Sequence, residues 1–110
     1  VTRMDSHGGW IASATDLARF MVKVDRNNSK TDLVSTTLLE KFYFGYSNWI
    51  HYGSLPGTSS ILSRLNNTFS FVILTNTRTE NNPELILDDL YDTVEDQINS
   101  VTEWPSNDLF

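Results

Sequence analysis

The spacing of apolar residues predicts helices in the first part of the chain. Apolar residues recur every three or four positions over residues 14–25, which places them on one face of a helix. Ser13 stands three residues before Asp16, the spacing of a capping box, in which each side chain binds the other's free backbone N–H. We therefore predict a helix over residues 14–25. After a polar loop, Ser35 and the apolar residues within 38–42 predict a second, short helix.

The pattern changes from residue 43 onward, where aromatic and β-branched residues are broken by glycine and proline. This pattern is typical of strands and turns, and we predict strands over residues 49–54, 59–65 and 69–75. Asn66-Asn67 separates the last two strands, and because asparagine tolerates the positive φ of tight hairpin turns, those strands should pair antiparallel. The third strand is apolar on most of both faces, so it should be central in the sheet or covered.

A last helix should begin at Pro83, because proline is favoured in the first helical turn and Asn81 or Asn82 can cap it. Its apolar stripe should lie across one face of the sheet. The predicted fold is α+β, with a three-stranded antiparallel sheet packed by N-terminal and C-terminal helices over residues 1–101 and a tail over residues 102–110. The stripe consists of Leu87, Leu90, Tyr91, Val94, Ile98 and Val101.

Composition excludes several classes of function. The 110 residues suit one small domain, and the apolar runs are too short to cross a bilayer. The net charge is −6, and residues 79–110 hold nine acidic residues and no basic one, which argues against nucleic-acid binding. Without cysteine the chain has no thiolate chemistry or disulfide. His7 and His51 are too far apart, and too poorly matched by carboxylates, to predict a metal site or a cofactor.

Several motifs follow one another in a distinctive order. Gly8-Gly9 leads into the segment Ser13-Ala14-Thr15-Asp16-Leu17-Ala18-Arg19-Phe20, and the predicted strands carry His51-Tyr52-Gly53-Ser54, then Pro56-Gly57, then Leu74-Thr75-Asn76. In this order the motifs resemble the C-terminal portion of the serine β-lactamase-like family. This family includes class C β-lactamases, D-alanyl-D-alanine peptidases and related esterases, and it is similar to the penicillin-binding proteins. The resemblance implies a β-lactamase/transpeptidase-like fold and an extracytoplasmic location.

The resemblance also implies roles for the residues of the first strand. His51 matches the Lys/His position of the family's wall strand, and the backbone N–H of Ser54 matches the second donor to the oxyanion of an acyl-transfer reaction. These two residues are the catalytic candidates. Tyr52 and Gly53 are the substrate-binding candidates, although Tyr52 replaces the threonine of the stricter β-lactamase motif. Without the resemblance, His51 would be interpreted as a half-exposed histidine hydrogen-bonded to its neighbours.

The nucleophile of such an enzyme has no counterpart, since no serine stands three residues before any lysine. Tyr46-Ser47-Asn48 spells the family's Tyr-x-Asn, but it lies just before the wall strand instead of far upstream, so it is not a candidate general base. We therefore expect a fragment or truncated relative that is inactive alone, from a parent serine hydrolase acting on a small-molecule or peptide substrate with an amide, ester or peptide bond. The alternative is a non-catalytic binding or assembly module on the same scaffold.

Self-association is the remaining expectation. In relatives an N-terminal strand pairs with the edge of the strand that corresponds to residues 69–75, and the sequence offers no such strand. An apolar edge left open invites pairing with another chain. We expect a homodimer or larger species joined through this edge or the neighbouring sheet face. The rival expectation is that an upstream segment or terminal residues of the same chain cover the edge.

Overall fold

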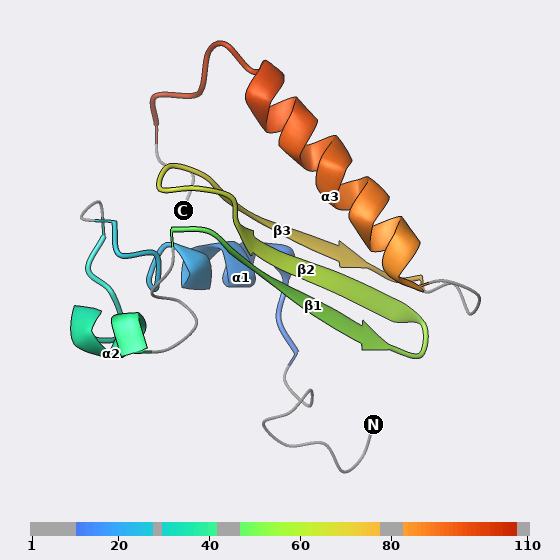
Figure 1. Cartoon of the computed structure of the whole chain (residues 1–110), viewed down its shortest axis with the longest axis horizontal. Coiled ribbons are helices and arrows are strands. Elements are labelled where there is room, and N and C mark those ends of the chain that lie inside the picture. The colour runs from blue at the N-terminus through green and yellow to red at the C-terminus, as the bar shows by residue number, and fades with distance from the viewer. Residues whose placement is uncertain (1–10, 28–29, 42–46, 78–82, 108–110) are drawn as a thin grey trace.

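The predicted α+β architecture is confirmed by the computed structural model, which describes residues 11–27, 30–41, 47–77 and 83–107. Within these residues the strands form one antiparallel sheet in the order β1-β2-β3, and helices pack against it (Figure 1). His7, Gly8-Gly9, Trp10 and Tyr46 lie outside the described residues. The elements are α1 (Ala14–Met21), α2 (Thr36–Lys41), β1 (Trp49–Leu55), β2 (Thr58–Arg64), β3 (Ser70–Thr75) and α3 (Pro83–Ser100).

Helix α1 begins with the predicted capping box. The Ser13 hydroxyl accepts the N–H of Asp16 at 3.1 Å, and the Asp16 carboxylate accepts the N–H of Ser13 at 3.2 Å. The predicted end at residue 25 is wrong, because the helix ends at Met21 and tighter bonds follow, with Val24 donating its N–H to the carbonyl of Met21. Arg26 then takes a φ of 59°, which turns the chain out of the helical path.

Helix α2 is short, as its sequence pattern predicts. The carbonyl of Ser35 accepts the N–H groups of Leu38 and Leu39 at 2.9 and 3.0 Å, so Ser35 precedes the first turn of the helix and accepts its first hydrogen bonds. Leu39 is its buried side chain, whereas the predicted contribution of Phe42 lies outside the described residues. The loop before α2 is tied back to the end of α1 through the N–H of Leu33 and the carbonyl of Lys23, at 2.7 Å.

The sheet separates two layers of packing. Phe71 contacts the ring of Tyr91 on α3, with ring centroids 5.3 Å apart, and the alternation of side chains along a strand places Ile61 and Ile73 on the same face as Phe71. Helix α1 packs against β3 and α3 against β2. Ile61 is fully buried at the centre of the sheet.

The two hairpin turns use different chemistry. In the β1–β2 turn, Pro56 is followed by Gly57 with a φ of 81°, the arrangement of a type II turn. Between β2 and β3 the expected positive φ is wrong, since neither Asn66 nor Asn67 has one. Instead the side-chain carbonyl of Asn66 accepts the N–H groups of Thr68 and Phe69 at 2.8 and 2.9 Å, and this side-chain bond shapes the turn.

Strand β3 is covered on its faces but lies at an edge of the sheet in the described part of the chain, so of the two predicted environments "covered" is correct and "central" is wrong. Helix α3 begins at Pro83 as predicted, and Leu87 of its stripe is buried. Beyond the helix, Trp104 packs on Phe69 with ring centroids 4.9 Å apart. Part of the predicted tail therefore returns to the sheet.

Candidate functional site

The four predicted site residues all lie on β1, but their side chains do not share one face. The hydroxyl of Tyr52 donates to Asp88 of α3, so Tyr52 and Ser54 point to the α3 face of the sheet. His51 and Gly53 point to the opposite face. A site on one face of the sheet can therefore use the imidazole of His51 or the phenol of Tyr52, but not both.

One hydrogen bond determines which N–H and C=O groups of β1 point toward β2 and which point away from it. The N–H of Leu65 donates to the carbonyl of Phe69 at 3.0 Å, which makes this the hydrogen-bonded pair that closes the β2–β3 hairpin. Hydrogen-bonded and non-hydrogen-bonded pairs alternate in an antiparallel ladder, so in β2 the odd-numbered residues bond to β3 and the even-numbered residues to β1. On β1, the backbone groups of Tyr52 and Ser54 are consequently directed away from β2, toward an edge where the described residues place no further strand.

The type II turn at Pro56-Gly57 gives the same alternation independently. A two-residue hairpin loop is closed by a hydrogen-bonded pair, here Leu55 and Thr58. The next pair, Ser54 and Ser59, is then a non-hydrogen-bonded one. Ser54 is also exposed, so its N–H is placed to bind a group that approaches the edge of β1.

His51 is exposed beside a buried aromatic ring. The rings of Trp49 and His51 meet edge to face, with centroids 5.5 Å apart. Trp49 is buried, and its ring contacts the imidazole on the α1 face of the sheet, where both side chains lie. The spacing of two residues could have indicated this contact, since it places both rings on the same side of a strand.

Tyr52 connects β1 to the C-terminal helix. Its hydroxyl lies 3.3 Å from Oδ1 of Asp88, and the side chain is 52% exposed. Partial desolvation, followed by the negative charge of Asp88, raises the pKa of Tyr52, so the phenol stays protonated and donates. Asp88 belongs to the acidic stretch of residues 79–110, and nothing local signals its pairing with a residue 36 positions earlier.

The sheet itself explains why position 53 is glycine. It lies opposite Ser60 on β2, and a Cβ at Gly53 would collide with the hydroxyl oxygen of Ser60. The missing side chain therefore makes room for a cross-strand hydroxyl. Close approach of a substrate backbone, the predicted role of Gly53, is a second use of the same space and not its only explanation.

A charged cluster lies where β1 begins. Arg64, opposite Trp49, is buried, and desolvation lowers its pKa, while Asp25 and Asp32 favour its charged form. Desolvation also raises the pKa of Asp25, whose carboxylate accepts the N–H of Asn27 at 2.7 Å. The carboxylates of the segment that follows α1 therefore partly offset the cost of burying the Arg64 guanidinium.

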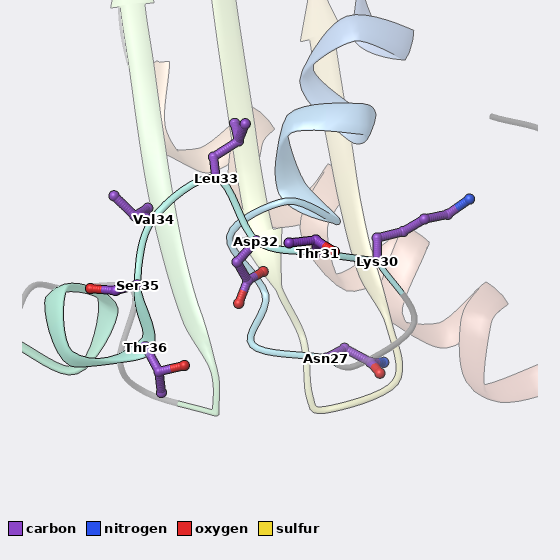
Figure 2. Close-up of a pocket in the computed structure, with 8 residues that line it drawn as sticks. All are labelled: Asn27, Lys30, Thr31, Asp32, Leu33, Val34, Ser35 and Thr36. Atoms are coloured by element: carbon purple, nitrogen blue, oxygen red, sulfur yellow. The ribbon is translucent and has the colours of Figure 1, made fainter.

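An open polar pocket of about 440 Å³ lies in the segment that joins α1 to α2 (Figure 2). Figure 2 shows the carboxylate of Asp32 near the centre of the lining, and its Oδ1 is buried without a hydrogen-bond partner among the described residues. The predicted site residues of β1 do not line this pocket. Its lining consists of Asn27, Lys30, Thr31, Asp32, Leu33, Val34, Ser35 and Thr36.

The described ranges hold no group of three or more histidine, aspartate or glutamate side chains that could bind a metal ion. No helix in the same ranges is long and apolar enough to cross a membrane. Comparisons with protein-family models, curated proteins and solved structures find no match for the chain.

Proposed function

We propose that the chain forms one wall of the active site of a β-lactamase-like serine hydrolase, whose nucleophile lies in another part of the parent protein. The observation that carries this proposal is the direction of the Ser54 N–H, which faces the open edge of β1 two residues from the exposed turn. An acyl-transfer enzyme needs fixed backbone N–H donors at the position where the oxyanion develops. A strand edge supplies such a donor without the cost of reorganising a loop.

In this proposal the backbone of β1 and the imidazole of His51 act together. An acyl group that approaches the edge of β1 meets the N–H of Ser54 in the plane of the sheet, and His51 stands on the α1 face beside it. A histidine there can hydrogen-bond a substrate carboxylate or assist proton transfer. The Tyr52 backbone extends along the same edge and is available to an extended small-molecule or peptide substrate, whereas its side chain is held by Asp88.

The test separates the Ser54 backbone from its side chain in a full-length parent protein that carries the nucleophile. Ser54→Pro removes the N–H, and because this N–H does not bond to β2, the β1–β2 ladder should survive. Loss of one oxyanion donor should lower kcat by about 10²–10³-fold. Ser54→Ala is the matched control and should retain most activity, and His51→Ala should depress acyl transfer while the fold stays intact.

The results that would contradict this proposal are specific. Complete loss of activity in Ser54→Ala would assign the chemistry to the hydroxyl. Full activity in Ser54→Pro would remove the oxyanion donor from the mechanism. The isolated chain should not turn over a chromogenic β-lactam or an activated ester, and turnover that disappears on changing one of its serines to alanine would overturn the assignment of the nucleophile to another part.

A second candidate function is assembly without catalysis. The observation that favours it is the edge position of β3 in the described sheet, on a strand without a charged residue or proline. In this case the chain is a non-catalytic module that associates with itself through the β3 edge. Sedimentation velocity over about a hundredfold range of concentration tests the proposal, because association depends on protomer concentration. A monomer at every concentration would exclude it.

A further inference from the structure

The outer edge of β3 presents a defined set of backbone groups. The Leu65–Phe69 bond fixes the alternation along the β2–β3 ladder, so Phe71, Ile73 and Thr75 bond to β2. The N–H and C=O groups of Ser70, Val72 and Leu74 are directed away from β2. In the described part of the chain, no strand lies on that side.

In the described part of the chain, the features that protect an edge strand are missing from β3. Natural edges carry lysine or proline, bulges, or a covering element that stops another strand from pairing. The sequence of β3 is Ser-Phe-Val-Ile-Leu-Thr, its pairing with β2 runs without a bulge, and Leu74 is 42% exposed. The chemistry of this edge therefore fits another extended, uncharged strand.

We propose that two copies of the chain pair antiparallel through β3, about a two-fold axis at Val72, to form a continuous six-stranded sheet. This inference rests on the assembly function proposed above and is an alternative to the hydrolase wall, because the resemblance implies that an N-terminal strand of the parent hydrolase pairs with the same edge. The occupant is a second copy, because a strand that pairs with itself satisfies both open edges with one self-complementary contact.

The position of the axis follows from the directions of the backbone groups. A two-fold axis normal to the sheet keeps the α3 faces of both copies on the same side, so residues that oppose each other across the new contact must share a face. Residues on one face are separated by an even number of positions, and the axis must therefore pass between one residue and its own copy. An axis at Val72 opposes Ser70 to Leu74 of the second copy and Val72 to itself, which gives three hydrogen-bonded pairs and about six hydrogen bonds. An axis at Phe71 or Ile73 gives only two such pairs.

The same register is favourable for the side chains. On the α3 face, Phe71 lies opposite Ile73 of the second copy in a non-hydrogen-bonded pair, where side chains approach most closely. Aromatic and β-branched residues form favourable cross-strand pairs. On the other face, Val72 meets Val72 and the exposed Leu74 is partly covered by Ser70. No like charges are brought together, because β3 has no charged residue.

Proline at position 72 tests the edge without disturbing the rest of the sheet. The N–H of Val72 does not bond to β2, so Val72→Pro removes only a donor that the second copy would use. We expect the dissociation constant of the dimer, measured by sedimentation, to rise at least about tenfold. Val72→Ala keeps the N–H and is the matched control, expected to remain dimeric, and circular dichroism checks that both variants keep the fold.

Two further measurements keep the test decisive. If Val72→Pro does not fold, Leu74→Lys replaces it, since an exposed edge position accepts lysine and lysine blocks edge pairing. In a mixture of carbon-13-labelled and unlabelled wild-type chains, a filtered nuclear Overhauser effect between the Phe71 ring and the Ile73 methyl groups reports the register. A dimer that persists in the edge variants, or that lacks this effect, overturns the register; a wild-type monomer also defeats the assembly function.

Discussion

The replacement of Gly53 by alanine tests whether the glycine of the wall strand serves the sheet. Gly53 lies opposite Ser60, and a Cβ at position 53 would overlap the Ser60 hydroxyl oxygen while standing 3.6 Å from the Ser60 Cβ. The second distance is an ordinary contact, so the obstacle is the hydroxyl alone. We therefore expect Gly53→Ala to be destabilising in the wild-type background and tolerated where Ser60 is alanine.

The magnitudes can be estimated from the two competing effects. Alanine is favoured over glycine within a strand by about 0.5–1 kcal/mol, because glycine loses more conformational freedom on folding. Overpacking costs about 1–3 kcal/mol when a neighbour must leave its preferred rotamer. Gly53→Ala should therefore lower the free energy of unfolding by about 0.5–2 kcal/mol, and in the Ser60→Ala background it should raise that free energy by about 0.5–1 kcal/mol.

Urea unfolding of the four proteins, followed by tryptophan fluorescence, measures this coupling as a double-mutant cycle. For a small domain with a slope of about 1–3 kcal/mol per molar urea, a change of 1 kcal/mol moves the midpoint by roughly 0.3–1 M. Ser54→Ala, on the exposed opposite face of β1, is a control that should change stability by no more than about 0.5 kcal/mol. Equal effects of Gly53→Ala in both backgrounds would show that Ser60 is not the reason for the glycine.

Three further predictions concern single side chains. Arg26→Gly should unfold with a free energy about 1 kcal/mol higher than Arg26→Ala, because both lose the ion pair with Glu40 but only glycine takes a φ of 59° without strain; urea unfolding measures it. Tyr52→Phe should lower the free energy of unfolding by about 0.5–1 kcal/mol at neutral pH, because the bond to Asp88 is lost. Since the pKa of Tyr52 is raised in the folded state, the wild type alone loses this stability as the pH rises from about 10 through that raised pKa, and thermal melts should converge only above it. Burial raises the pKa of Asp25, which disfavours its carboxylate, so Asp25→Asn should melt higher than wild type at neutral pH and equal to it below about pH 3.

The fold was predictable where short-range patterns decide it. The capping box at Ser13, the proline that begins α3 and the Pro56-Gly57 turn are local signals, and all three appear as expected. The end of α1 was not predictable, because Leu33 binds the carbonyl of Lys23 through a contact that no local pattern encodes. The β2–β3 turn was located correctly, although its asparagine acts through its side chain instead of a positive φ.

The candidate site was only partly predictable for a similar reason. The sequence located His51 on a strand, whereas the contact of its ring with Trp49, two residues earlier, was not predicted. It could not show that Tyr52 binds a residue of the last helix or that Gly53 accommodates Ser60, because both depend on pairings that exist only in the folded sheet. The roles implied for the β1 backbone remain predictions, whereas the direction of that backbone follows from the ladder.

Both proposed functions depend on backbone groups more than on side chains, which decides how they should be probed. Alanine scanning leaves an N–H in place, so it would leave both the Ser54 donor and the β3 edge unchanged. Proline removes the N–H, and the alternation of the ladder determines where the fold tolerates this loss. Ser54 and Val72 face outward, whereas Gly53 and Ile73 bond to β2 and should not accept proline. The same periodicity of two that predicted the strands therefore also separates the positions that act on other molecules from those that hold the sheet together.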